Sequence, residues 1–310
     1  MRQAVQNTLK ASVAFEGVGL HGGAPARIVL HPAPAGYGIR FHRTDIKVGN
    51  AEVIARWDQV ERVPLCTRLV NAAGVSVSTV EHLMAALAGC GIHNARIEID
   101  GPEVPILDGS AAPFVRRIMR HGLRPLPARV EVIEVLRPVS VSHGDARASL
   151  LPYPGVRIDF EIDFEDAAIG RQRRGLDLRN GAFARELCDS RTFCRQADVD
   201  AMQAQGLALG GTLENAVVVD GAKVLSPGGF RHPDEAVRHK MLDALGDLAL
   251  AGAPILGRYV GEKAGHALTN LLLHELFSRR DAWRRVTCDP RTAATLPGVG
   301  LVAEEIPEVA

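Results

Sequence analysis

The chain has 310 residues, with 36 Lys and Arg against 36 Asp and Glu, so its formal net charge at pH 7 is zero. That length suits about two domains, and the 46% hydrophobic and 23% charged residues are ordinary globular values that argue against bulk disorder. A balanced charge without a long block of one sign gives no reason to expect nucleic-acid binding.

No stretch approaches the ~18 uninterrupted apolar residues of a membrane helix, and the N-terminal sequence MRQAVQNTLKASVAFEG lacks the apolar core of a secretion signal. The five cysteines are odd in number and form no CxxC pair, which argues against a disulfide framework or a structural zinc knuckle. We therefore expect a soluble, cytoplasmic protein without a membrane segment.

The first third alternates short strands with turns, and a helix follows within residues 78–91. Residues 95–99 alternate like a strand, with Ala95, Ile97 and Ile99 on one side. A second helix is predicted over 110–122. The prolines that come next, in LRPLPARVEVIEV, place a domain boundary at about residues 124–130.

The second half repeats this order, with strands between 130 and 164 and a helix near 197–205. The strongest helical pattern covers 234–252, and a strand at 255–261 and a last helix at 266–279 follow. We predict an N-terminal domain at 1–126, a C-terminal domain at 127–280 and a tail without assigned chemistry at 281–310. Two α+β halves fit sheet-on-helix layers better than a doubly wound parallel sheet. Neither a Rossmann nor a P-loop glycine signature is present.

His239, Asp243 and Asp247 recur at i, i+4 and i+8 on the strongest helix. Residues four apart are neighbours on a helix, so His239 and Asp243 can face one shared ion. An imidazole nitrogen and a carboxylate oxygen are suitable zinc ligands, but two ligands are too few for a site. The alternative is a solvated His–Asp pair on the helix surface.

The pair Glu81–His82 offers a third ligand and an adjacent carboxylate that can accept a proton from a metal-activated water. The alternative is a core histidine beside an acidic residue at a helix N-terminus. His266 begins the last helix, where Asp247 could keep it protonated and neighbouring Lys263 could meet an anion. Its alternative is a capping or structural role.

Taken together, eight segments resemble the zinc-dependent UDP-3-O-acyl-N-acetylglucosamine deacetylase family of lipid A biosynthesis, and they span about residues 3–280 in the family's order. The segments are GVGLHGG (17–23), LCTRLVN (65–71), STVEHLMAALAGCGIHN (78–94), PILDGSAAPF (105–114), SRTF (190–193), GLALGG (206–211), VRHKMLDALGDL (237–248) and GHALTN (265–270).

The resemblance implies a cytoplasmic, monomeric amidase that removes acetate from a UDP-linked, 3-O-acylated glucosamine. Its expected fold is α+β, with two similar domains that each contain a mixed sheet and two helices. The helices lie between the two sheets, and the active site lies at the domain junction. The implied cofactor is Zn²⁺, with Fe²⁺ as the alternative ion in the cell.

Carried over by motif position, the metal ligands are His82, His239 and Asp243, and Glu81 is the general base on the metal-activated water. The resemblance further implies that His266, oriented by Asp247, protonates the leaving amine or stabilises the oxyanion. Thr192 is implied to hydrogen-bond the oxyanion, and Lys240 to face the diphosphate and substrate carbonyl region. The implied substrate-binding residues are His21, Phe164, Phe193, Gly211, Lys263, Val199, Ala208, Ala216 and Val218.

Within that set, Phe164 resembles the residue that stacks on uracil, and His21 would line the sugar-nucleotide site. The acyl passage would be lined by five residues, for which ordinary core packing is the alternative: Phe193, Val199, Ala208, Ala216 and Val218.

The chain departs from the family pattern at Cys194–Arg195, where glycine and an apolar residue are usual. Cys66 is expected near the metal without being a ligand.

Two other functions stay open: a zinc amidohydrolase of another N-acylated sugar, and a non-catalytic sugar-nucleotide-binding homologue. Every expected catalytic position is filled, which favours an enzyme.

Overall fold

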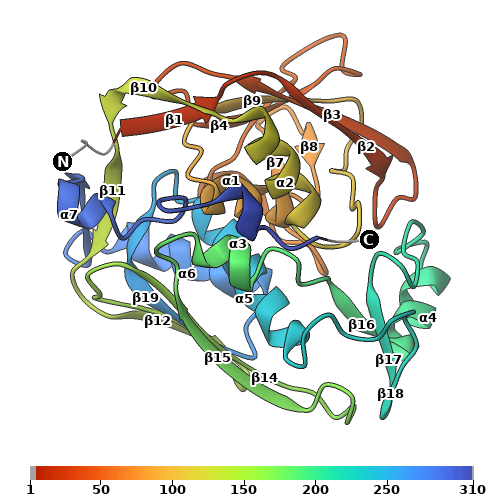
Figure 1. Ribbon diagram of the computed structural model, residues 1–310. Helices are drawn as coiled ribbons and strands as arrows, with labels where there is room; N and C mark the ends of the chain where they lie inside the picture. Colours follow the sequence, from red (N-terminus) through yellow and green to blue (C-terminus); the bar gives the residue numbers. More distant parts are fainter. Residues whose placement is uncertain (1–4, 309–310) are drawn as a thin grey trace.

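In the computed structural model, which describes residues 5–308, two β-sheets lie on opposite sides of a layer of helices (Figure 1). The outermost ends of the predicted ranges 1–126 and 281–310 lie outside the described residues. The expected α+β class, with helices between two mixed sheets, is confirmed.

The sheet of the N-terminal half is mixed, because β9 runs parallel to β4 and antiparallel to β3. Ala95, Ile97 and Ile99 of β9 are buried, whereas the residues between them are half-buried, as the alternation predicts. The strand order of this sheet is β2 (Val13–Val18), β3 (Pro25–Pro32), β9 (Ala95–Ile99), β4 (Ile39–Arg43) and β5 (Glu52–Ile54). The helices of the N-terminal half are α1 (Glu81–Gly89) and α2 (Ala112–His121).

Two smaller sheets border this half. One pairs β1 (Val5–Leu9) with β10 (Leu123–Arg129), so the stretch predicted to hold the domain boundary is itself a strand paired with the N-terminal half. The other contains β6 (Val60–Glu61), β7 (Arg68–Val70) and β8 (Ser76–Val77), which lead the chain into α1.

The sheet of the C-terminal half is also mixed, and its strand β19 runs parallel to both β11 and β14. Helices α5 (Glu235–Ala249) and α6 (His266–Ser278) match the two predicted C-terminal helices within a few residues at each end. The strand order is β12 (Val139–His143), β13 (Ala146–Leu151), β19 (Ile255–Glu262), β11 (Glu131–Val135) and β20 (Trp283–Thr287), with β14 (Val156–Asp163) beside β19 and β15 (Arg171–Asp177) beside β14.

Between this sheet and α5, the chain forms an insert with its own three-stranded sheet, which projects from one side of the molecule (Figure 1). It contains β16 (Phe193–Arg195), α4 (Gln196–Ala204), β17 (Val217–Asp220) and β18 (Lys223–Val224). Short helices elsewhere are η1 (Trp57–Gln59), α3 (Ala182–Glu186), α7 (Pro290–Ala293) and η2 (Ala303–Glu305). Within residues 5–308, none of the helices combines the length and apolar character needed to cross a membrane.

Helices α1 and α5 pack against each other in the middle layer, and glycine permits their close approach. A Cβ on Gly246 of α5 would overlap the backbone oxygen of Glu81 at the start of α1. The contact therefore brings the first turn of α1 against the middle of α5, where the predicted metal ligands lie.

Candidate metal centre and active site

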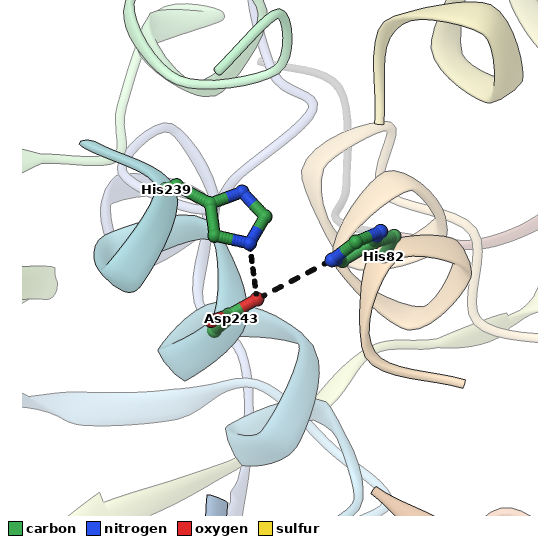
Figure 2. Close-up of side chains that lie close together, drawn as sticks. All are labelled: His82, His239 and Asp243. Carbon is green, nitrogen blue, oxygen red and sulfur yellow. Dashed lines mark ion pairs between the residues drawn. The ribbon is translucent and has the colours of Figure 1, made fainter. Parts of the chain in front are cut away.

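The three predicted metal ligands meet where α1 faces α5 (Figure 2). His82 comes from the first turn of α1, and His239 and Asp243 lie one turn apart on α5. Asp243 Oδ1 lies 3.2 Å from His239 Nε2 and 3.5 Å from His82 Nε2. One donor atom from each residue falls within 4.8 Å of the others, and all three side chains are buried. The cluster can therefore hold a metal ion.

The chemistry of these donors fits a cation. His239 Nδ1 bonds the carbonyl oxygen of Ser190 at 3.0 Å, so Nδ1 carries the hydrogen and Nε2 offers its lone pair to the cluster. Burial lowers the pKa of His239 to about 4, which keeps the imidazole in its neutral, ligating form. No group among the described residues donates a hydrogen bond to the buried Asp243 Oδ1. An unpartnered carboxylate oxygen between two imidazoles is what a bound cation would satisfy.

Lys240 lies beside this cluster and contacts the other oxygen of Asp243. Its Nζ donates a hydrogen bond of 2.8 Å to Asp243 Oδ2. Burial alone would lower the pKa of Lys240, but the charge of Asp243 outweighs it and raises the pKa. The same partners act on Asp243: burial favours its neutral form, whereas His239 and Lys240 hold its pKa well below the usual range.

Glu81 precedes the ligand His82 and is buried next to it. Its Oε2 accepts a hydrogen bond of 3.0 Å from the backbone N–H of Thr67, and its Oε1 lies 3.8 Å from His266 Nε2. Burial raises the pKa of Glu81 despite the opposing charges of His266 and His82. A raised pKa makes the carboxylate a stronger proton acceptor, as the role of general base requires.

His266 begins α6 and completes the group. Its Nδ1 bonds Asp247 Oδ2 at 2.8 Å, and its Nε2 points toward Glu81 and lies 3.9 Å from Asp243 Oδ2. Burial alone would lower the pKa of His266, but the carboxylates of Asp247 and Glu81 raise it to about 9. A protonated imidazole opposite a basic carboxylate is an arrangement suited to acid–base chemistry.

The loop before β16 is anchored by a buried ion pair. Glu235, at the start of α5, accepts hydrogen bonds from the backbone N–H and the Nε of Arg191, each at 2.9 Å. Thr192 follows, with its N–H bonded to the carbonyl of Gly109 at 2.8 Å. This loop places the Ser190 carbonyl on His239 and holds the backbone of Thr192 two residues further on.

Two predicted substrate-binding aromatics lie beside the cluster. The ring centroid of Phe193 is 6.2 Å from that of His239 and 5.3 Å from that of Phe164. Lys263, three residues before His266, forms ion pairs with Asp145 and Asp163, the residue next to Phe164. The structure thus places Phe193 against His239 and Phe164 against Phe193, and it pairs Lys263 with the residue before Phe164.

The glycine-rich segments 17–23 and 206–211 contact each other through their backbones. Leu209 N–H bonds the carbonyl of His21 at 3.2 Å, and Gly210 N–H bonds that of Leu20 at 3.0 Å. Both ring nitrogens of His21 are buried without a hydrogen-bond partner among the described residues. Gly211 ends the second segment, with its N–H bonded to the carbonyl of Ala208. Polar ligand atoms could satisfy His21 here.

The residues predicted to line an acyl passage lie on or beside the insert. Phe193 is on β16, Val199 on α4 and Val218 on β17, while Ala216 precedes β17. Ala208 and Val218 are buried and the others are half-buried. Their common location on the insert agrees with a shared role, and that role stays a prediction.

The structure also places two cysteines noted in the sequence. Cys66 lies outside the three-residue cluster found among the described residues, and burial raises the pKa of its thiol to about 12, helped by Glu81. Cys194 and Arg195 belong to β16, where Arg195 forms a bidentate pair with Asp198 of α4.

Thr67, Ser190, Arg191 and Glu235 support the site, and sequence reasoning assigned them no role. Thr67 lies in the segment LCTRLVN, and Ser190 and Arg191 lie in SRTF. For these three residues, membership in a family segment was the only available signal. Spacing could not reveal the Thr67 contacts, since its hydroxyl partner Asp247 is 180 residues away.

Comparison with known proteins gives the same assignment. Residues 6–278 match the family model described as LpxC, UDP-3-O-acyl N-acetylglycosamine deacetylase. A curated relative from Phenylobacterium zucineum, named UDP-3-O-acyl-N-acetylglucosamine deacetylase, is 50% identical over 90% of this chain and 95% of its own length. Relatives with the same name from Shewanella loihica and Shewanella frigidimarina are 46% and 44% identical, over 91% and 92% of this chain and 92% and 93% of their own lengths. The family is one of metalloenzymes, in agreement with the His–His–Asp cluster. The chain belongs to the UDP-3-O-acyl N-acetylglycosamine deacetylase family.

Proposed function

We propose that this chain hydrolyses the N-acetyl group of UDP-3-O-acyl-N-acetylglucosamine and releases acetate, as a step of lipid A biosynthesis. The observation that carries the proposal is the cluster of His82, His239 and Asp243 with Glu81 and His266 beside it. A metal site flanked by a basic carboxylate and a protonated imidazole suits hydrolysis of an amide. Family membership supplies the substrate class.

His82, His239 and Asp243 would hold the metal ion, for which Zn²⁺ is our assignment and Fe²⁺ the alternative. When bound, such an ion polarises a carbonyl group and lowers the pKa of water. Two imidazole nitrogens and one carboxylate oxygen form a common ligand set for catalytic zinc.

Two residues beside the cluster carry out the two proton transfers of the reaction, Glu81 as acceptor and His266 as donor. Glu81, whose pKa is raised by burial, accepts a proton from the attacking water as the new carbon–oxygen bond forms. His266, held protonated by Asp247, donates a proton to the amine nitrogen as the carbon–nitrogen bond breaks. Thr192 and Lys240 would stabilise the negative charge that develops on the carbonyl oxygen. The products are acetate and the free amine of the sugar.

Binding of the rest of the substrate is assigned by position. Lys263 would meet the diphosphate, Phe164 the uracil ring and His21 the sugar nucleotide. The insert that carries Phe193 and Val218 would receive the acyl chain. Support comes from the packing of Phe193 against His239 and of Phe164 against Phe193, and from the ring nitrogens of His21, which have no hydrogen-bond partner among the described residues.

The test is acetate release from a UDP-3-O-acyl-N-acetylglucosamine substrate before and after metal removal with a chelator, followed by addition of Zn²⁺ or Fe²⁺. We expect release that disappears on chelation and returns with the metal. Glu81→Ala should retain the metal and lose turnover by orders of magnitude, and loss of the metal would make Glu81 a ligand. A folded, zinc-loaded protein that releases no acetate would refute the substrate and favour another N-acylated sugar or a non-catalytic binding role.

The predictions of a cytoplasmic location and a monomeric state are separate from this assay. Cell fractionation and sedimentation analysis would test them.

A further inference from the structure

Thr67 contacts two of the carboxylates that face His266, those of Asp247 and Glu81. Thr67 lies just before β7 and is buried. Its hydroxyl donates a hydrogen bond of 2.6 Å to Asp247 Oδ1 on α5, and its backbone N–H donates one of 3.0 Å to Glu81 Oε2 on α1. The hydroxyl contact joins the two halves of the chain at the metal centre.

The second oxygen of each carboxylate faces the imidazole of His266. Asp247 Oδ2 lies 2.8 Å from His266 Nδ1, and Glu81 Oε1 lies 3.8 Å from His266 Nε2. A carboxylate is planar, so a hydrogen bond that fixes one oxygen also restricts the direction of the other. Thr67 thereby limits how both groups can rotate.

We propose that Thr67 is a positioning residue for deacetylation, whose hydroxyl sets the orientation of Asp247 and, through it, of the His266 ring. The inference rests on the proposed function, because it concerns the acid–base pair of that reaction. Partners that orient the ligands of a metal site typically change activity by about 10- to 100-fold when removed, and we expect a loss of that order for the Thr67 hydroxyl, which acts on His266 through Asp247. Without the hydroxyl, Asp247 Oδ1 loses its donor in a buried setting, and the carboxylate can turn away from His266.

The competing explanation is that Thr67 only stabilises the fold, as any buried hydroxyl does. Thr8 in β1 provides a matched control, because it is fully buried and outside the metal centre. Its hydroxyl donates to the Asn94 carbonyl at 2.7 Å and accepts from the Ala33 N–H at 2.9 Å. Thr8→Val therefore removes an equally buried hydroxyl without touching the acid–base pair.

The experiment compares Thr67→Val, Thr67→Ser and Thr8→Val in the zinc-loaded protein. For Thr67→Val we expect kcat to fall about 10- to 100-fold with KM and metal content unchanged. The proton resonance of His266 Nδ1–H should shift in Thr67→Val, because its bond to Asp247 changes. Thr67→Ser should restore most of kcat and the resonance, while Thr8→Val should lower Tm and leave kcat unchanged.

The inference is overturned if Thr67→Val keeps the wild-type kcat, if Thr67→Ser is as impaired as Thr67→Val, or if only KM changes. Should Thr67→Val fail to fold, Thr67→Cys takes its place, because a thiol has nearly the shape of the serine hydroxyl but is a weak donor. Equal kcat for the Cys and Ser variants would then refute it. A wild-type protein without metal-dependent acetate release would refute the proposed function itself, whereas an active wild type with an unaffected Thr67→Val variant refutes only the positioning role.

Discussion

Replacing Gly246 with alanine is expected to separate the two helices that carry the metal ligands. The added Cβ would overlap the backbone oxygen of Glu81 and lie 2.9 Å from its carbonyl carbon, where ordinary contact begins at 3.4 Å. Since the obstacle is backbone, no side-chain rotation relieves it. To relieve the overlap with the oxygen, helices α1 and α5 must move apart by about 1 Å or more, and this displaces Glu81 and His82 from His239.

Two opposing effects set the size of the change. In an exposed helix, alanine is favoured over glycine by about 1 kcal/mol. Overpacking of a buried contact costs about 1–3 kcal/mol, so the free energy of unfolding should fall by up to about 2 kcal/mol in spite of the better helix propensity. Activity is more sensitive, because a misplacement of about 1 Å can lower a catalytic rate by about 100-fold.

The assay combines urea denaturation, zinc content and kcat for Gly246→Ala. Gly101→Ala is the control, because a Cβ at Gly101 meets no atom within 4 Å. We expect the control to match the wild type and Gly246→Ala to lose stability, zinc affinity and most of kcat. A Gly246→Ala protein with wild-type stability and kcat would refute the idea that this helix contact sets the geometry of the centre.

Three further predictions concern single groups of the site. Asp243→Ala should lower the zinc retained after gel filtration, measured by atomic absorption, and unchanged zinc would remove Asp243 from the ligands. As a proton donor, His266 is active below its pKa, which the neighbouring carboxylates raise to about 9, so kcat should fall as the pH rises through that pKa. Asp247→Asn removes one of those carboxylates, and the fall should begin at lower pH; an unmoved pH profile would contradict the acid role. Arg191→Met leaves the charge of Glu235 buried without its partner, so the free energy of unfolding, measured by chemical denaturation, should fall by about 3–5 kcal/mol. The double variant Arg191→Met with Glu235→Leu should recover part of this loss. Equal stability of the wild type and both variants would contradict this reasoning.

The elements that carry the site were predictable from the sequence, because their periodicity reports burial directly. Apolar residues at helical spacing located α1, α5 and α6, and the alternation of Ala95, Ile97 and Ile99 located β9. The i, i+4 spacing likewise placed His239 and Asp243 on one face of α5. The meeting of His82 with this pair follows from packing of α1 on α5, and only the family resemblance anticipated it.

Other elements gave no such signal. Strand β15 has the sequence RQRRGLD and lies at a sheet edge, where it is held to the helix layer by polar contacts. Arg174 of β15 bonds Asp234 and Glu186, and Gln172 accepts a hydrogen bond from the N–H of Val237. Strand β20 lies in the range 281–310, which was predicted to be a tail. Its sequence WRRVT has two arginines among five residues, and none of the five is fully buried. Polar edge strands have no apolar period, so periodicity alone misses them.

The charges of the site explain why so many ionisable groups can be buried together. Three carboxylates, Glu81, Asp243 and Asp247, face two cations, Lys240 and His266. These five groups carry one negative charge in excess when all three carboxylates are ionised. Burial, with a smaller effect from Asp247 and Asp243, raises the pKa of Glu81. A divalent cation would instead reverse the sign, which favours the negative charge that develops on the amide oxygen during hydrolysis. Metal binding and stabilisation of the buried carboxylates thus have the same electrostatic origin, and a bound divalent cation should lower the pKa of Glu81 from the raised value that it has without the ion.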